Sequence, residues 1–398
     1  MMILGKRMMI VVLIVMAGLA VCTWLPVKTA DVVTQDERII EFEISPNGRL
    51  DAVVVARQPQ DSDETHYTLY LIEDNGKRLV SNNALTPRWS SDGNSIAFVH
   101  NAKLVDFPPQ YSDTRITMYL LSQRSTKQIT TGHWDNWPTW NTDGNAIMFI
   151  RAALDEKPYA RLEMVRRYGE TFGFPRPIGP KYATISDLQW RPYHQEVAYV
   201  GWSPISRKAK GRFPSRDIYV LTTQTGQVRK LTKTGSIAKE TLAWSPDGRN
   251  LAYAGETPYL IGKPESGGKF TELVTIEPDK MEYHELLAAS QIGNKPIRAG
   301  SLRWSPDGKQ IVFDVLTLDK TAKTDIALVE WPDGNFRWLT QDGMSKLPRW
   351  SSSGHTIMYI REDMEIWSMN SDGSGNKKVY DLEDQSVTVT QADNRCRP

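Results

Sequence analysis

The sequence predicts an all-β fold: a β-propeller of four-stranded antiparallel blades that follows an N-terminal signal or anchor segment. Three observations predict this fold. One turn motif recurs about every 50 residues, each copy joins two segments with strand-like alternation of apolar residues, and no long helical pattern occurs after residue 30. Repeats of this length are typical of propeller blades rather than of helical solenoids. The motif occurs in seven units, so we expect seven blades.

The repeated motif is best preserved at Trp244-Ser-Pro-Asp-Gly248 and Trp304-Ser-Pro-Asp-Gly308. Ser, Pro and Gly at the first, second and fourth positions after the tryptophan are typical of a type I turn. The units are centred on Ile44, Trp89, Trp140, Trp190, Trp244, Trp304 and Trp350, at intervals of 45, 51, 50, 54, 60 and 46 residues. The fourth unit lacks the Asp-Gly pair and the seventh has Ser353 in place of Asp, so six or eight blades stay open beside seven.

Each turn joins a strand that ends at the tryptophan to a second strand of alternating pattern. A third strand and a short fourth strand complete most units. The predicted second strands include 95–99, 146–150 and 310–313, the third strands include 218–221, 326–329 and 366–369, and the fourth strands end near the Leu-Thr pairs at 231–232 and 339–340. Four antiparallel strands per unit, repeated radially, make a propeller blade. Large tryptophan rings once per blade are expected to pack between neighbouring sheets.

These motifs resemble the TolB-type propeller repeat, a relative of the WD repeats, over residues 37 to 385. The resemblance implies the fold and says little about function. TolB itself has an α/β domain ahead of a usually six-bladed propeller, and here only a few residues separate the export segment from the first repeat. The same propeller is also found ahead of the hydrolase domain of serine oligopeptidases, but this sequence has no Gly-x-Ser-x-Gly elbow. The predicted domains are 1–30 for the export segment, 31–390 for the propeller and 391–398 for a tail.

The N-terminal segment is predicted to direct export. Lys6 and Arg7 precede an uncharged apolar run over residues 8–25, as in a secretory signal. Cleavage after Ala20, retention as a membrane anchor, and lipidation at Cys22 stay open. All three place the rest of the chain outside the cytoplasm, in the periplasm, at the cell surface or secreted, with residues 8–25 as the membrane tether if they remain attached.

Composition excludes several classes of protein. The formal net charge of +1 argues against a nucleic-acid binder, and a mean hydropathy of −0.44 argues against several membrane spans. The two cysteines, near opposite ends of the chain, predict no structural disulfide. The six histidines fall in different repeats without metal-ligand spacing. The sequence therefore predicts no catalytic or metal-binding residues and no cofactor, and it favours a non-enzymatic protein.

Binding is expected on the face with the long connections, at about 100–114, 201–216, 255–268 and 288–300, because long loops on a rigid scaffold commonly carry recognition. Exposed tryptophan and clustered basic residues are common in contact surfaces. The candidate partner-binding residues are Trp134, Asp135, Trp137, Trp202, Arg207, Lys208, Lys210 and Arg212. For Trp134 and Trp137, capping of the blade core is the alternative role.

The leading functional hypothesis is an exported, monomeric, non-enzymatic propeller that acts as a scaffold and binds another envelope or extracellular protein. The alternative is an enzyme, or a binder of a small saccharide or peptide, with its site on the propeller axis. That alternative predicts acids or histidines that converge at one mouth of the axial channel.

Overall fold

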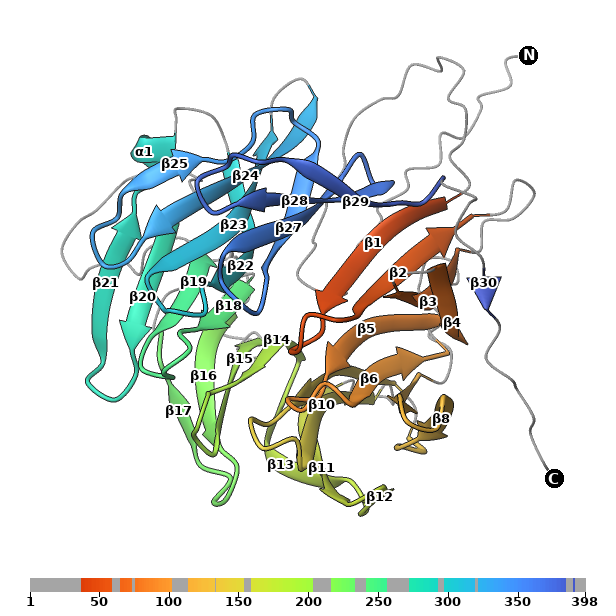
Figure 1. Cartoon of the computed structure of the whole chain (residues 1–398). Coiled ribbons are helices and arrows are strands. Elements are labelled where there is room, and N and C mark those ends of the chain that lie inside the picture. The colour runs from red at the N-terminus through yellow and green to blue at the C-terminus, as the bar shows by residue number, and fades with distance from the viewer. Residues whose placement is uncertain are drawn as a thin grey trace, which may run out of the picture.

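Seven antiparallel sheets form the blades of a propeller (Figure 1). The computed structural model describes residues 37–58, 65–73, 76–101, 114–132, 134–153, 159–202, 216–232, 241–255, 272–292, 297–318, 321–383 and 389–390. The predicted fold class and blade count are confirmed. The export segment and the tail 391–398 lie outside the described residues, as do Arg207, Lys208, Lys210 and Arg212. Within the described part, no helix has both the length and the apolar character needed to cross a membrane.

The first four blades follow the order of the chain, with the first strand of each blade innermost. Their strands are β1 (Glu37–Ile44), β2 (Asp51–Arg57), β3 (His66–Glu73) and β4 (Gly76–Asn82); β5 (Ala84–Trp89), β6 (Ser95–His100), β7 (Arg115–Leu120) and β8 (Ser125–Gln128); β9 (Asp135–Trp140), β10 (Ala146–Ala153), β11 (Tyr159–Tyr168), β12 (Thr171–Phe172) and β13 (Arg176–Tyr182); β14 (Thr184–Trp190), β15 (Glu196–Trp202), β16 (Arg216–Thr222) and β17 (Val228–Lys230).

The last three blades continue in the same way. Their strands are β18 (Thr241–Trp244), β19 (Leu251–Gly255), β20 (Glu272–Glu277) and β21 (Glu282–Leu287); β22 (Ile297–Trp304), β23 (Gln310–Leu318), β24 (Ala322–Glu330) and β25 (Phe336–Trp338); β26 (Ser345–Trp350), β27 (Thr356–Arg361), β28 (Glu365–Asn370) and β29 (Lys377–Asp381). A one-turn helix, α1 (Ala289–Ile292), precedes blade 6, and β30 (Val389–Thr390) adds a parallel strand to the outer edge of β4.

The predicted tight turns connect the first and second strands. In all seven blades the amide of the fourth turn residue donates to the carbonyl of the first, as in Gly248 to Ser245 at 2.9 Å. The Ser245 hydroxyl also donates to Asp247 at 2.6 Å. Gly248 has a φ of +71°, a conformation that glycine adopts without a steric cost. The Ser-Pro-Asp-Gly motif therefore encodes both the turn and its side-chain brace.

The fourth strands end two residues earlier than predicted. β17 ends at Lys230 and not at the Leu231-Thr232 pair. The Leu231 amide donates to the Ile218 carbonyl at 2.8 Å, while the Ile218 amide donates to the Thr232 hydroxyl at 2.9 Å. The threonine side chain thus takes the place of a backbone acceptor. The same arrangement occurs in blades 2 and 6, at Thr130 and Thr340.

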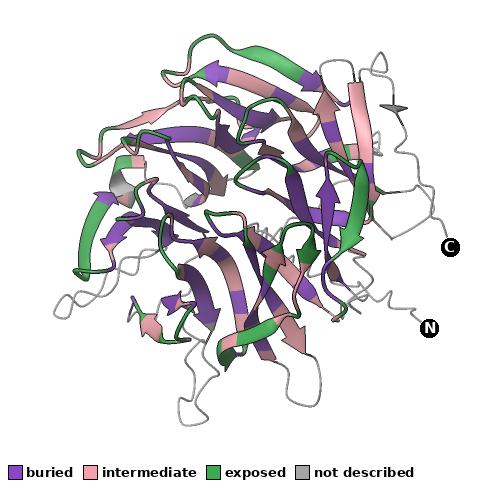
Figure 2. Cartoon of the chain, turned by 60° about the horizontal axis from the view of Figure 1, so that its bottom comes forward, coloured by how far each residue is buried: buried purple, intermediate pink, exposed green. Residues whose placement is uncertain are grey.

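The repeated tryptophans join neighbouring blades, as predicted. Each indole donates to the backbone carbonyl of the residue just before the equivalent position in the preceding blade. The six bonds run from Trp89 to Glu43, Trp140 to Arg88, Trp190 to Thr139, Trp244 to Gln189, Trp304 to Ala243 and Trp350 to Arg303, at 3.0–3.3 Å. We call this series the indole relay. Buried residues of adjacent blades form shared cores around it, whereas exposed residues gather at the outer edges (Figure 2).

The junction between blades 7 and 1 is different, because Ile44 stands where the other blades have tryptophan. Blade 1 therefore has no indole at this position that could donate to a carbonyl of blade 7. This junction is held by an apolar cluster that includes Phe42 and Ile360, and by a backbone bond from the Ile39 amide to the Asp363 carbonyl at 2.6 Å. The first four strands of blade 1 and the four strands of blade 7 are each consecutive in the chain, and β30, which follows blade 7, crosses to the outer edge of blade 1.

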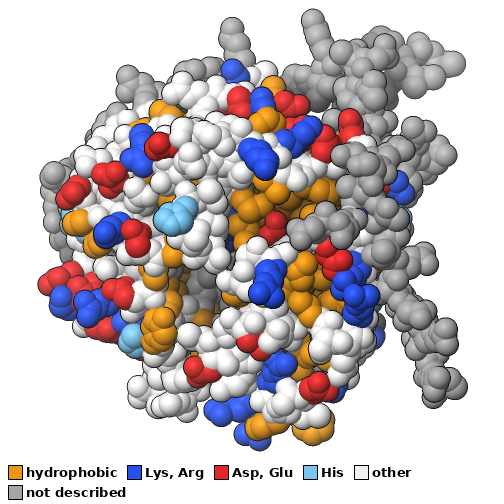
Figure 3. Space-filling view, viewed as in Figure 1, with side chains coloured by type: hydrophobic (Ala, Val, Ile, Leu, Met, Phe, Trp, Pro, Cys, Tyr) orange, Lys and Arg blue, Asp and Glu red, His pale blue; other side chains and the backbone are white. Residues whose placement is uncertain are grey.

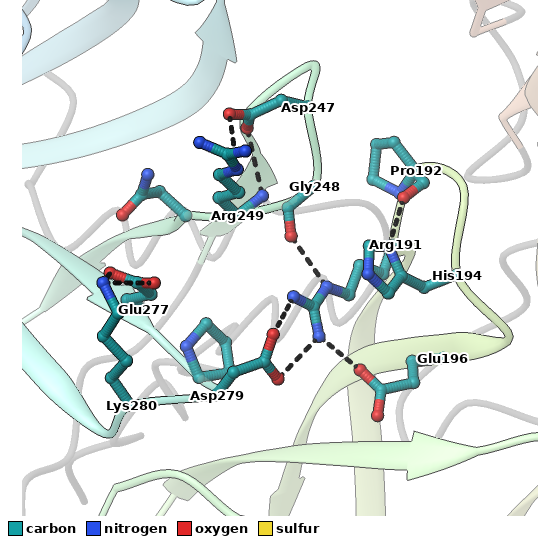
Figure 4. A network of polar contacts seen from close by, with 12 residues as sticks. Arg191, Pro192, His194, Glu196, Asp247, Gly248, Arg249, Glu277, Asp279 and Lys280 are labelled. Carbon is teal, nitrogen blue, oxygen red and sulfur yellow. Dashed lines mark hydrogen bonds and ion pairs between the residues drawn. The ribbon is translucent and has the colours of Figure 1, made fainter.

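The irregular fourth turn makes an inter-blade lock (Figure 4). Arg191 occupies the position of the usual serine and is buried, with its side chain 2% exposed. It contacts Glu196 at 2.7 Å, Asp279 of blade 5 at 2.5 Å and the Gly248 carbonyl at 2.7 Å. In blade 4, Arg191 thus replaces the side-chain hydrogen bond that Ser245 makes to Asp247 within its own turn, and it contacts blade 5 instead.

We expect Asp279→Asn to lower the free energy of unfolding by about 0.5–1 kcal/mol at pH 7, since Asp279 is half-exposed and Glu196 still pairs with Arg191. Hydrogen bonding to Arg191 lowers the pKa of Asp279 below its usual 3.8. Its stabilising effect is therefore present above pH 3.8 and is lost as the pH falls through the lowered pKa. Urea unfolding at pH 7 and at about pH 3 measures this, and an equal difference at both pH values would contradict it.

Candidate functional site

Charged side chains from five inner strands converge on the propeller axis. The residue before each repeated tryptophan or Ile44 contributes to this region, because its side chain points to the opposite face of the strand from the packed tryptophan. In blades 1, 2, 6 and 7 these residues are charged: Glu43, Arg88, Arg303 and Arg349. In blades 3, 4 and 5 they are Thr139, Gln189 and Ala243. At this position of the strand, one side of the axis is therefore charged and the other is neutral.

Two acids of β1 face Arg88 of β5. The Arg88 guanidinium lies 2.7 Å from Glu41 and 3.1 Å from Glu43. Glu41 is buried and also accepts the Thr86 amide at 3.1 Å. Burial alone would lower the pKa of Arg88, but the two carboxylates outweigh it and raise that pKa. Arg88 is therefore fully paired.

Glu43 is shared by three arginines. Its carboxylate also lies 3.6 Å from Arg349 and 3.9 Å from Arg303. Burial raises the pKa of Glu43, yet the three guanidiniums outweigh burial, so the net pKa is below 4.5. One carboxylate thus compensates the charge of two further arginines, and it forms a close pair with neither.

Arg303 is the least compensated member of the group. Its guanidinium donates to the Leu302 carbonyl at 2.8 Å, and its contact with Glu43 is longer than a hydrogen bond. Burial, followed by repulsion from Arg349, lowers the pKa of Arg303 to about 10. Among the described residues, Nε of the buried Arg349 also has no hydrogen-bond partner. This pair of guanidiniums has capacity for a further anion.

Asp187 of β14 reaches the same region from blade 4. It accepts the Leu242 amide and is electrostatically coupled to Arg303 and Arg88 on blades 6 and 2. Blade 4 is not a neighbour of either of these blades, so such coupling acts across the axis. Burial raises the pKa of Asp187 to about 6, which allows this carboxyl to exchange a proton near neutral pH. We call Glu41, Glu43, Arg88, Asp187, Arg303 and Arg349 the axial cluster.

The axial cluster combines two chemical capacities. The Arg303–Arg349 pair can bind a carboxylate, because guanidinium groups match carboxylates in shape and charge. Asp187 can hold or release a proton in the same electrostatic field. The members precede the tight turns, so the cluster lies toward the turn side of the axis. In the view of Figure 3 the surface is hollowed between the blades.

We expect Asp187→Asn to change the pH dependence of stability. Because the pKa of Asp187 is raised in the folded protein, the stabilisation that comes from its protonated form is fully present below pH 3.8. This stabilisation is lost as the pH rises through about 6. At pH 7 the variant should therefore be more stable than the wild type by about 1–2 kcal/mol, because Asn avoids a partly buried charge and still accepts a hydrogen bond. Urea unfolding at pH 4 and pH 7 measures the effect. A wild type that is equally stable or more stable than the variant at pH 7 would contradict it.

The structure places the sequence-predicted residues in different settings. Asp135 is fully buried and is held by Arg151 at 2.6 Å, and Arg151 also pairs with buried Glu163. Trp137 packs against the apolar core between blades 3 and 4, the capping role considered from the sequence. Trp134 is partly buried, and Trp202 ends β15. Contact of these residues with a partner stays a prediction.

No member of the axial cluster is among the candidate residues predicted from the sequence. The available signal was the Arg-Trp pair, which occurs in three of the seven units, at Arg88, Arg303 and Arg349. The alternative hypothesis predicted acids or histidines at the axis, and the acids are present together with arginines. Among the described residues, no group of three or more His, Cys, Asp and Glu side chains is placed to hold a metal ion.

No family model matches the chain. Dipeptidyl-peptidase 5 of Porphyromonas gingivalis is 22% identical over 383 residues, which cover 83% of this chain and 51% of that protein. The chain thus spans about half the length of this curated relative. The propeller domain of the Trilobed protease from Pyrococcus furiosus, described as having an open velcro topology, matches with a TM-score of 0.62 and 16% identity over 88% of this chain and 97% of that domain.

Oligogalacturonate lyase in complex with manganese matches with a TM-score of 0.56 and 14% identity, over 80% of this chain and 84% of the lyase. TolB proteins are also among the similar solved structures. At these identities the solved structures show the fold. The propeller fold predicted from the repeats is therefore confirmed.

The leading functional hypothesis from the sequence was wrong. It described a non-enzymatic scaffold, whereas the propellers similar to this chain belong to a dipeptidyl-peptidase, a protease and a lyase. The repeats could not show this, because they specify blades and do not specify a reaction. The alternative, a site for a saccharide or peptide on the axis, agrees better with these similarities.

Proposed function

We propose that this propeller is an exported enzyme, or the substrate-binding part of one, and that its axial cluster binds the carboxylate of an oligosaccharide or peptide. The observation that carries the proposal is the Arg303–Arg349 pair, a partly buried and a buried guanidinium that share the distant Glu43 carboxylate. A substrate carboxylate between them would be a closer ionic partner than Glu43, which lies 3.9 Å from Arg303 and 3.6 Å from Arg349. The similarity to a dipeptidyl-peptidase, a protease and an oligogalacturonate lyase supports a peptide or an oligosaccharide as the substrate. The basic and apolar N-terminus supports export.

Calorimetric titration of the purified protein with defined probes distinguishes binding of an oligosaccharide carboxylate from binding of a peptide carboxylate. Trigalacturonate carries a carboxylate on each sugar, and its matched control is the neutral trisaccharide maltotriose. For peptides, Gly-Gly-Phe with a free C-terminus is compared with its C-terminal amide. We expect binding of one carboxylate probe and not of its neutral counterpart. Mass spectrometry of the same mixtures detects cleavage products.

Arg303→Gln should weaken binding of the active probe by about 10- to 100-fold, because a charge-assisted hydrogen bond contributes about 1.5–3 kcal/mol. Arg49→Gln is the matched control, since Arg49 is exposed on a blade 1 turn. Equal affinities of the two variants would contradict the proposed site. Failure of the wild type to bind any carboxylate probe would contradict the proposed function.

A further inference from the structure

Blade 3 carries a hairpin extension that the other blades lack. β11 pairs with β13 near its middle, where Met164 lies opposite Arg176, and with β12 at its end, where Arg167 lies opposite Phe172. Two strands, β12 and β13, thus pair with β11, where the third strand of each other blade pairs with a single fourth strand. It lies at the periphery of the propeller (Figure 1).

One face of this extension forms a pocket. Alternation along a strand places Met164, Arg166 and Tyr168 on the same face of β11, opposite to buried Val165. With Gly173, Phe174 and Arg176 they line a surface cavity of about 310 Å³. We call it the blade 3 pocket. This volume is enough for one large side chain of a bound molecule.

The blade 3 pocket has the composition of a contact surface. Phe174 is 92% exposed and Tyr168 is 64% exposed. Arg166 and Arg176 are exposed, and neither side chain has a hydrogen bond or an ion pair among the described residues. Aromatic and arginine side chains are the residues that most often dominate the energy of protein interfaces. Basic and hydrophobic side chains gather at the bottom of the molecule in Figure 3, below the blades.

Charge is concentrated in the same segment. Residues 159–182 contain five basic and two acidic residues, a net charge of +3, while the whole chain has +1. One of the two acids, Glu163, is buried and paired with Arg151 and Arg161. The surface that surrounds the pocket is therefore complementary to an acidic ligand.

The extension is braced from the preceding blade. Gln123 donates to the Glu170 carboxylate at 2.8 Å, and Lys127 donates to the Glu170 carbonyl at 2.8 Å. Both partners come from the β7–β8 hairpin of blade 2. A fixed pocket loses less conformational entropy on binding than a mobile loop does.

We propose that the blade 3 pocket docks an acidic segment of a partner protein, with an apolar side chain between Tyr168 and Phe174 and carboxylates on Arg166 and Arg176. Recognition uses side chains and not strand addition, because Pro177 and Pro180 lie in the outer strand β13 and cannot donate to a further strand. The concave shape favours an inserted side chain over a flat lipid surface. This docking site is independent of the axial cluster.

The test uses fluorescein-labelled nonapeptides with a central Phe, Leu or Gln and two Glu residues at varied spacing, with Lys-for-Glu peptides as matched probes. We expect the full chain to bind Glu peptides that have a central Phe or Leu, and their Lys counterparts at least 10-fold more weakly. Arg166→Glu combined with Arg176→Glu should weaken binding about 30-fold or more. Phe174→Ser should weaken binding of the Phe and Leu peptides and leave the circular-dichroism spectrum unchanged.

The charge-matched control combines Arg49→Glu with Lys309→Glu, two exposed positions on turns of blades 1 and 6. Equal loss in this control and in the pocket variant would overturn the proposal, as would peptides that bind regardless of charge. Flotation with phosphatidylglycerol vesicles tests whether the blade 3 pocket binds a membrane surface instead of a protein. Vesicle binding that depends on Arg166 and Arg176, without peptide binding, would replace the protein partner by a membrane surface.

Discussion

Replacing Glu43 with glutamine is expected to lower the free energy of unfolding by about 3–5 kcal/mol. The substitution keeps the size of the side chain and removes the carboxylate that faces Arg88, Arg303 and Arg349. Removal of one partner from a buried ion group leaves uncompensated charge, which costs more than the original pairing contributes. Arg88 retains Glu41, so most of the loss arises at Arg303 and Arg349. Thermal and urea unfolding at pH 7 measure the effect.

The matched control for Glu43→Gln is Glu330→Gln, which removes a surface partner of Arg337 and should cost less than about 1 kcal/mol. In the Glu43→Gln variant, stability and carboxylate binding are expected to change in different directions. Its axis is more positive than that of the wild type, so it should bind a carboxylate probe at least as tightly although it unfolds more easily. A Glu43 effect as small as that of Glu330 would mean that solvent in the channel screens the three arginines.

Trp304→Ala is expected to cost about 3–5 kcal/mol as well, through loss of packing between blades 5 and 6. Trp304 is buried in a shared core, contacts Trp331 edge-to-face at 5.7 Å between ring centroids, and donates to the Ala243 carbonyl at 3.0 Å. Trp304→Phe keeps most of the ring and loses the indole N–H, so its cost should be about 1–2 kcal/mol.

A control for the tryptophan series is Trp367→Phe. The indole of Trp367 bonds to Glu365 of its own strand at 2.7 Å, so its loss does not break a bond between blades. We expect Trp367→Phe to cost less than about 1 kcal/mol. Equal effects of phenylalanine at positions 304 and 367 would contradict the role of the indole relay. Urea unfolding, followed by circular dichroism, measures the series.

The repeats predicted the blades because their physical signals are local. A type I turn requires particular residues at fixed positions, and the tryptophan recurs wherever a wedge between sheets must be filled. The hairpin extension on blade 3 was not predicted, since Pro175, Pro177 and Pro180 make the segment read as a loop. Those prolines are compatible with an outer strand, where an amide donor is not needed on the free side.

The axial cluster could be predicted only in part, because it depends on contacts far apart in the chain. Glu43 meets Arg349 from the other end of the propeller, and no local pattern specifies that pairing. Asp135 illustrates the converse problem. Beside two tryptophans it has the composition of a contact site, but Arg151, sixteen residues later, holds it inside blade 3.

The indole relay has a direction and two ends, although the blades form a closed circle. Every bond runs from one blade to the blade before it, and blade 1, with Ile44, offers no donor to the Arg349 carbonyl of blade 7. An extra blade added between these two ends could bond to Arg349 and leave all six existing bonds intact. Insertion at any other junction would break one of them. An extra blade is therefore accommodated most easily at the junction between blades 7 and 1.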